Sequence, residues 1–116
     1  LYHRLLFRAY CHLPEKADQL SLRMSPQAAV NGALVFNMMG CIFANAFDLL
    51  PALQTLAIPT LVIHGDDDVV PFSTAETLHE NIKDSIYILL KDCGHFPYVE
   101  QPYHYFDSLK TFLTHE

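Results

Sequence analysis

The sequence has few basic residues, few glycines and cysteines, and no tryptophan. Its seven Lys and Arg side chains are scattered among 13 Asp and Glu, which gives a formal net charge of −6 with histidine neutral. Nucleic acids and anionic membranes are bound by clusters of basic side chains that neutralise phosphates, so we expect neither as a partner. No apolar run reaches the length of about 18 residues that a membrane-spanning helix needs.

The three cysteines, Cys11, Cys41 and Cys93, are odd in number and far apart. No C-x-x-C pair occurs, so the pattern indicates neither a disulfide framework nor a zinc site. Free thiols are typical of a reducing compartment, and we predict a cytoplasmic protein. The apolar fraction of 51% and the charged fraction of 17% are typical of a globular chain, whose length suggests one small domain.

The first 50 residues predict helices. Apolar side chains recur at helical spacing over residues 1–13. The pair Ser25-Pro26 is typical of a helix start, and we expect a largely apolar helix over residues 27–45, in which Gly40 permits an interruption. A short third helix is predicted over residues 47–56.

Residues 51–116 alternate between strand and helix patterns. The predicted order is a strand, a helix, a strand and a helix, at residues 58–63, 73–82, 85–90 and 103–113, with a loop over 91–102. Ser73 and Glu76 have the spacing of a capping box at the start of the first of these helices. Apolar strands that alternate with helices are typical of an α/β fold, in which the two strands would be parallel neighbours.

Functional side chains follow each predicted strand. Asp66, Asp67 and Asp68 come after the first strand, and His95 comes after the second. Because the carboxyl ends of parallel strands meet at one edge of a sheet, an aspartate and the histidine should lie close together. A carboxylate that accepts a hydrogen bond from one ring nitrogen fixes the tautomer and lets the other nitrogen take a proton. The sequence therefore predicts an acid–histidine pair that activates a nucleophile.

The same side chains allow other roles. A solvated turn explains one or two aspartates at a strand end, but it does not explain the matching histidine loop. A metal site built from His64, Asp66 and His95 lacks the usual ligand spacing. Cys93 is too close to His95 in sequence to align as a nucleophile, so we expect a small loop residue there.

The other histidines are expected in structural or surface positions. His64 ends the first strand and should hydrogen-bond locally. His79, His104 and His115 fall on predicted helices and should lie on the surface. We assign no role to His3 and His12.

The stretches DLLPALQTLAIPTLVIHGDDDVVP and CGHFPYVEQP, with the final helix, resemble the α/β-hydrolases over residues 47–116. In that family a strand leads into G-x-x-D, often with proline three residues further on, and Gly65, Asp68 and Pro71 match. The resemblance implies that Asp68 is the catalytic acid and that His95 is the catalytic histidine. The two preceding aspartates are then expected to hydrogen-bond their own backbone in the turn.

The resemblance also implies the fold and the reaction. The chain would be the C-terminal portion of an α/β-hydrolase fold: two parallel strands with flanking helices at residues 51–116, preceded by a helical cap-like segment at residues 1–50. The family's nucleophile lies upstream in G-x-S-x-G, a motif this chain lacks. The opening LYHRLLF, without methionine, looks cut from a longer chain. We expect serine-type hydrolysis of an ester, amide or related carbonyl, as in esterases and aminopeptidases, without cofactor or metal.

Five residues are candidate substrate-binding positions. Phe36, Met39 and Phe43 lie in the cap-like segment, and Val69 and Phe96 lie beside the implied acid and histidine. The alternative for the cap residues is that they form the core of the cap itself.

The chain is expected to need a partner. Two paired strands leave a hydrogen-bonding edge open, and apolar strands need cover on both faces. We expect the complementary N-terminal portion of the hydrolase, or self-association, to supply both, with a small-molecule ester or amide as substrate. The competing hypothesis is a non-catalytic, truncated module used for binding. The absent nucleophile favours that hypothesis, whereas Asp68 and His95 in full motif context favour the hydrolase.

Overall fold

The computed structural model describes residues 2–20, 25–44 and 48–114, without the side chains of residues 2–4 and 43. The first half is helical, as predicted. It contains α1, a 3-10 helix η1, the long helix α2 and the short helix α3, at Tyr2–Arg8, Pro14–Gln19, Pro26–Ala44 and Leu50–Leu53. The Ser25 Oγ accepts a hydrogen bond from the Ala28 amide at 3.1 Å, which confirms the predicted cap of α2.

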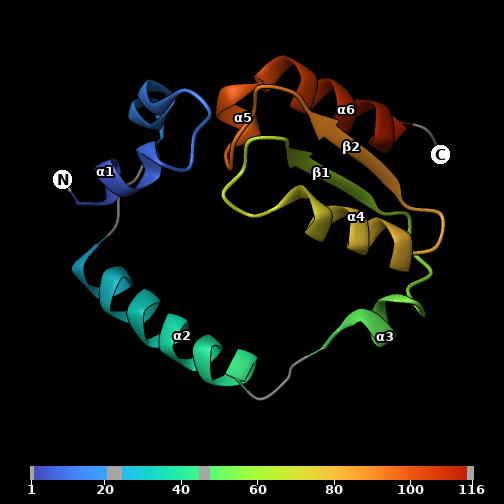
Figure 1. Cartoon of the computed structure of the whole chain (residues 1–116), viewed down its shortest axis with the longest axis horizontal. Helices are drawn as coiled ribbons and strands as arrows, with labels where there is room; N and C mark the ends of the chain where they lie inside the picture. The colour runs from blue at the N-terminus through green and yellow to red at the C-terminus, as the bar shows by residue number, and fades with distance from the viewer. Residues whose placement is uncertain (1, 21–24, 45–47, 115–116) are drawn as a thin grey trace.

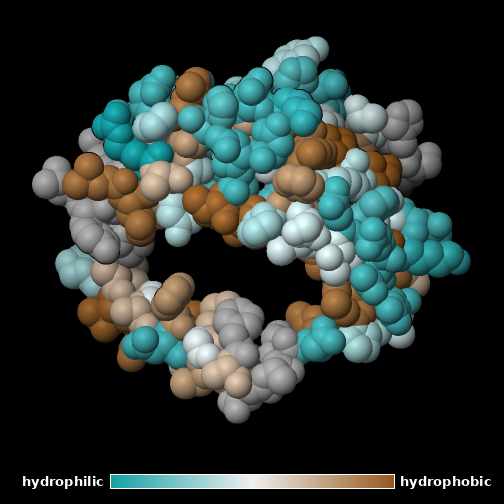
Figure 2. Space-filling model, in the orientation of Figure 1, coloured by the Kyte–Doolittle hydropathy of each residue, from teal (hydrophilic) through white to brown (hydrophobic). Residues whose placement is uncertain are grey.

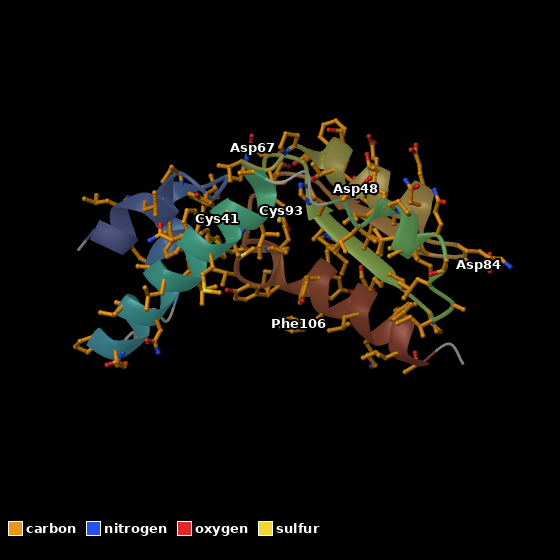
Figure 3. All side chains as sticks on the ribbon, turned by 90° about the horizontal axis from the view of Figure 1, so that it is seen from below. Cys41, Asp48, Asp67, Asp84, Cys93 and Phe106 are labelled. Atoms are coloured by element: carbon orange, nitrogen blue, oxygen red, sulfur yellow. The ribbon has the colours of Figure 1, made fainter. Side chains whose placement is uncertain are left out.

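The second half is a β-α-β-α unit with two parallel strands. Strand β1 (Leu61–Gly65) pairs with β2 (Ile86–Leu90) in the register Leu61↔Ile86 to Gly65↔Leu90. Helix α4 (Phe72–Asn81) joins the strands, and α5 (Pro97–Glu100) and α6 (Pro102–Thr114) follow β2. The sheet lies between α4 and α6 in two perpendicular views (Figures 1 and 3). This arrangement confirms the predicted α/β class and places the ends of both strands at one edge.

Several predicted boundaries were wrong. Strand β1 occupies 61–65 rather than 58–63, because Pro59 has no amide to donate and Ile58 stays 61% exposed. The predicted loop after β2 contains the short helix α5. Helix α1 ends at Arg8 rather than at residue 13, because the chain turns there toward the loop that follows β2.

Three predicted details of the helices were also wrong. Ser73 does not cap α4, because the helix begins one residue earlier and the Pro71 carbonyl accepts bonds from the amide and hydroxyl of Thr74. Helix α2 continues through Gly40 without interruption. Helix α3 is shorter than residues 47–56 and begins where the Asp48 carboxylate accepts the Leu50 amide.

The chain forms an open ring rather than a packed body. Helix α2 stands apart from the sheet in Figure 1, and an opening passes through the ring in the space-filling view (Figure 2). The radius of gyration is 16.3 Å, whereas a compact domain of this length has about 13 Å. The accessible surface is 8684 Å², about 2,300 Å² more than a compact monomer of this mass exposes. The fold therefore leaves a large apolar surface uncovered.

Candidate active site

The acid turn, residues 66–71, follows the carboxyl end of β1. The Asp68 carboxylate accepts the Val70 amide at 2.9 Å, and only 6% of the Asp68 side chain is exposed. Nε2 of His64 hydrogen-bonds the Val70 carbonyl at 2.9 Å and lies 3.8 Å from the Asp68 carboxylate. His64 is thus a local structural partner of the turn, as the sequence predicts. The turn holds the Asp68 carboxylate in one orientation.

The histidine loop, residues 91–96, follows β2. Nδ1 of His95 lies 3.0 Å from both carboxylate oxygens of Asp68. The His95 side chain is 41% exposed, and in the described part of the chain no residue hydrogen-bonds its Nε2. A carboxylate on Nδ1 holds the proton at that nitrogen and leaves Nε2 as the basic site. The pair can therefore take a proton from a nucleophile placed beside Nε2.

Two glycines let the loops approach this closely. A Cβ on Gly65 would lie closer than 3.0 Å to the carbonyl oxygens of Cys93 and Gly94. A Cβ on Gly94 would lie closer than 3.0 Å to the Tyr10 carbonyl oxygen and the His12 amide nitrogen. Three backbone segments are therefore stacked at this edge of the sheet: the end of β1, the histidine loop and residues 10–12.

The two aspartates before Asp68 do not hydrogen-bond their own backbone, so that prediction was wrong. Asp66 lies 3.3 Å from the Lys91 ammonium and accepts the Cys93 amide at 3.4 Å. Burial pushes the pKa of Asp66 upward, but the bonds from Cys93 and Lys91 outweigh it and lower the pKa. Asp66 thus ties the acid turn to the histidine loop.

Asp67 pairs with His12, a residue to which the sequence assigned no role. Nδ1 of His12 lies 2.9 Å from the Asp67 carboxylate, and its Nε2 lies 3.9 Å from Asp92. Asp67 and Cys93 lie where the N-terminal segment meets the sheet (Figure 3). The hydrogen bond to Asp67 raises the pKa of His12, against the opposing effect of burial. The two partners are 55 residues apart in sequence, and no local pattern links them.

We expect this ion pair to make the melting temperature depend on pH. Because the folded-state pKa of His12 is raised above its ordinary value of about 6.5, the stabilisation is fully present below that pH and is lost as pH rises through the folded pKa. The melting temperature of Asp67→Asn should therefore fall below that of the wild type at about pH 5.5, and by less at about pH 9. Asp107→Asn, at an exposed position on α6, is the control. An equal deficit at both pH values would contradict the pairing.

Two of the three thiols, those of Cys11 and Cys93, are buried and should be unreactive. Burial raises the pKa of Cys93 to about 12 and the pKa of Cys11 to about 11, and the nearby Glu100 adds to both shifts. Cys93 is fully buried in the histidine loop, consistent with its predicted role as a small loop residue.

Alkylation should distinguish the three thiols. At pH 8 a thiol of pKa 11 is only about 0.1% thiolate, so Cys11 and Cys93 should resist iodoacetamide. Cys41 is exposed on α2 and should react. Intact mass should show one adduct under native conditions and three in denaturant. Rapid native labelling of Cys93 would contradict the buried loop.

The candidate substrate-binding residues lie in two separate parts of the structure, the loops at the sheet edge and helix α2. Phe96 is half-buried, and its ring meets the His95 ring edge-on, with centroids 5.3 Å apart. Val69 is exposed in the acid turn. Phe36 is 79% exposed on α2, and Met39 lies on the same helix. The side chain of Phe43 lies outside the described residues. Phe96 packs against the small core of Cys11, Ala17 and Leu20. Neither Phe96 nor Val69 lines the pocket that contains Asp68 and His95, and α2 stands apart.

A pocket of about 350 Å³ contains His64, Asp68 and His95. A larger groove of about 580 Å³ runs between α6 and the other end of the strands, lined by apolar residues such as Leu61, Ile86 and Phe112. The groove lies away from the pair, and its lining is that of a packing surface, so the smaller pocket is the candidate site.

Among the described residues, the remaining histidines do not form a catalytic or metal-binding site. Nδ1 of His79 hydrogen-bonds Ser85 Oγ at 2.7 Å and its ring stacks on Tyr87, so His79 is half-buried and not at the surface as predicted. His104 is exposed, and His115 lies outside the described residues. Within residues 2–20, 25–44 and 48–114, no cluster of three potential metal ligands occurs. In the same ranges no helix is long and apolar enough to cross a membrane.

Several known hydrolases are similar to this chain. No protein-family model matches the chain. The chain is 36% identical over 63 residues to 2-hydroxy-6-oxo-6-(2'-aminophenyl)hexa-2,4-dienoic acid hydrolase of Metapseudomonas resinovorans, a match that covers 53% of the chain and 22% of that protein. It is 29% identical over 96 residues to the proline iminopeptidase of Thermoplasma volcanium, which covers 81% of the chain and 32% of the relative.

A solved structure of another enzyme is also similar to this chain. A protein described as an N-acyl homoserine lactone degrading enzyme superposes with a TM-score of 0.54 and 29% identity, over 58% of this chain and 26% of that one. The proline iminopeptidase of Saccharolobus solfataricus matches 72% of the chain at 29% identity. The chain spans about a quarter of the length of the curated relatives it matches. The chain belongs to the α/β-hydrolase superfamily and has the fold of its C-terminal part.

Proposed function

We propose that the chain supplies the acid and the histidine of a serine-type hydrolase. The observation that carries this proposal is the pair at the edge of the sheet, where both oxygens of the buried Asp68 carboxylate lie 3.0 Å from Nδ1 of the half-exposed His95. A buried acid behind an accessible imidazole is the arrangement that a general base requires. The nucleophilic serine would come from outside this chain, which contains no G-x-S-x-G.

The proposed reaction moves one proton through His95. Nε2 takes the proton of the serine hydroxyl as its oxygen attacks the carbonyl carbon, and the Asp68 carboxylate stabilises the resulting imidazolium. The imidazolium then gives that proton to the leaving group, which departs as an alcohol or amine and leaves an acyl-enzyme. A water molecule releases the acyl group by the same two steps. These steps involve no cofactor.

The substrate we propose is a small molecule with an ester, amide or related carbonyl. The relatives' names describe a peptidase, a hydrolase of a dienoic acid and a lactone-degrading enzyme. Val70, Leu78 and Pro97 give the pocket of the pair an apolar wall, which favours an apolar acyl group. Phe36 and Met39 of α2 would add to this wall only if α2 packs over the site. The buried thiols of Cys11 and Cys93 fit a cytoplasmic location, which we also propose.

Labelling with a fluorophosphonate, read by intact mass, tests the proposed function. We expect the label on a co-purifying or added N-terminal portion of the hydrolase, dependent on the presence of this chain. Label on this chain itself would overturn the proposal that the nucleophile lies elsewhere. No label in the assembled preparation would instead favour the non-catalytic binding module.

We further propose that the uncovered surface is an interface with that complementary portion, or with a second copy. Within the described residues β1 and β2 pair only with each other, so one edge of each strand is open. An excess of roughly 2,300 Å² of exposed surface matches the area that large, permanent interfaces bury. Helix α2, without a single charged residue, is apolar on all sides, as buried helices are.

The mass of the purified protein in solution should reflect this interface. Light scattering after size exclusion should give a molar mass above the 13.2 kDa of one chain, or the chain alone should melt without a cooperative transition. The reason is that an isolated chain exposes too much apolar surface to offset its conformational entropy. A 13.2 kDa monomer with a sharp two-state melt would contradict the proposed interface.

A further inference from the structure

Residues 10–12, between α1 and η1, lie directly against the histidine loop. The His95 amide donates to the Tyr10 carbonyl at 2.8 Å, and the rings of Tyr10 and His95 meet edge-on, with centroids 5.4 Å apart. Gly94 faces the backbone of the same three residues, where a Cβ would not fit. The backbone of His95 is therefore held by a segment more than 80 residues away in sequence.

Glu100, at the end of α5, joins that segment to the loop. It is 8% exposed, a charged residue buried among the described residues. One carboxylate oxygen accepts the His12 amide at 2.6 Å, and the other accepts the Phe96 amide at 3.1 Å. Hydrogen bonds to a carboxylate are about twice as strong as neutral ones, particularly where water is excluded.

The two backbone amides that donate hydrogen bonds to Glu100 lie on different sides of His95. Phe96 is the next residue in the chain, and His12 belongs to the segment whose Tyr10 carbonyl accepts the His95 amide. A single carboxylate thus closes a ring of hydrogen bonds around the backbone of His95. The His12 side chain extends the same connection to Asp67, the neighbour of Asp68. Movement of the His95 backbone relative to Asp68 would have to break one of these links.

We propose that Glu100 is a positioning residue for His95, which acts by clamping residues 10–12 onto the histidine loop so that Nδ1 stays on Asp68. This role rests on the proposed function, because it concerns the same pair. The clamp sets the tautomer of the imidazole: while Nδ1 faces the carboxylate, the proton stays on Nδ1 and Nε2 is the free base. Without the clamp the ring can leave Asp68, and both neutral tautomers become populated.

The test is the ring nitrogen spectrum of His95 in the ¹⁵N-labelled protein, purified with any chain that accompanies it. Glu100→Gln keeps the size of the side chain but places an amide NH₂ against one of the two backbone amides, so one of the two bonds is lost. Glu80→Gln, at an exposed position on α4, removes the same charge elsewhere and is the matched control. Exchange rates of the Phe96 and His12 amides are measured on the same samples.

In the wild type and in Glu80→Gln we expect the tautomer protonated at Nδ1, with slow exchange at both amides. In Glu100→Gln we expect amide exchange at least tenfold faster and a mixture of the two tautomers. Faster exchange with an unchanged tautomer would overturn the positioning role and leave Glu100 a purely structural residue. A wild-type His95 protonated at Nε2 would instead contradict the proposed function, so the two failures are distinguishable.

A second variant covers the case in which Glu100→Gln does not fold. Gly94→Ala keeps the Glu100 carboxylate but pushes residues 10–12 away from the loop, because the new Cβ meets the Tyr10 carbonyl and the His12 amide. A mixed tautomer in Gly94→Ala supports the clamp. A tautomer that remains at Nδ1 while the Tyr10–His95 hydrogen bond is lost overturns it.

Discussion

Replacing Asp68 with asparagine is expected to lower turnover, and the rate of fluorophosphonate labelling, about 10⁴-fold in the assembled hydrolase. The side-chain oxygen of the new asparagine can still accept the Val70 amide, so the acid turn should keep its shape. Its NH₂ group then lies as close to Nδ1 of His95 as the remaining oxygen does, which disfavours a proton on Nδ1 and shifts the imidazole toward the tautomer that has no free base at Nε2. The measurement is the labelling rate at fixed protein concentration, together with the melting temperature.

Asp84→Asn is the matched control for this variant. Asp84 is exposed before β2, at the other end of the sheet from Asp67 (Figure 3), and forms a surface ion pair with Lys83. Its labelling rate should equal that of the wild type, because exposed ion pairs contribute little. A full labelling rate in Asp68→Asn would remove Asp68 from the proposed triad.

Replacing Gly65 with alanine should destabilise the protein by roughly 3 kcal/mol or prevent folding. The added Cβ meets the carbonyl oxygens of Cys93 and Gly94, which belong to backbone and cannot rotate away. The end of β1 would have to separate from the histidine loop, and Asp68 would move with it. Urea unfolding followed by circular dichroism measures the loss.

Gly32→Ala and Gly40→Ala are the controls, because the same substitution should stabilise the protein at these two positions. Both glycines lie within α2, where nothing is within 4 Å of the new Cβ. Alanine in a helix interior should raise stability by about 0.5–1 kcal/mol. Equal effects at Gly65 and Gly40 would contradict the close stacking of backbone at the sheet edge.

Local patterns were sufficient to predict the α/β class and an aspartate beside His95, and the resemblance to the α/β-hydrolases implied that this aspartate is Asp68. Each residue follows a strand that can be recognised by its apolar run, and parallel strands place their ends at the same edge. The boundary of β1 was misplaced because the apolar run extends ahead of the strand through Ile58 and Pro59, and hydropathy alone does not register a missing amide. The prediction of the Ser73 cap failed for a similar reason, since Pro71 is the N-cap and the helix begins at Phe72.

The contacts that surround the pair could not be predicted from the sequence. His12 meets Asp67 across 55 residues, and Glu100 meets the His12 amide across 88 residues. One partner in the Glu100 contacts is always a backbone amide, which every residue type except proline provides, so no side-chain pattern identifies it. Gly94 was visible in the sequence, but the segment that requires it to be glycine was not.

The contact between His12 and Glu100 also bears on how the chain folds. It closes a loop of nearly 90 residues that contains α2, both strands and α4, and closing such a loop has a large entropic cost. The strands, α4 and the histidine loop are close together in sequence and can assemble first. We therefore expect residues 10–12 to dock late, in a phase slower than formation of the sheet. The imidazole would acquire its final orientation only in that last step of refolding.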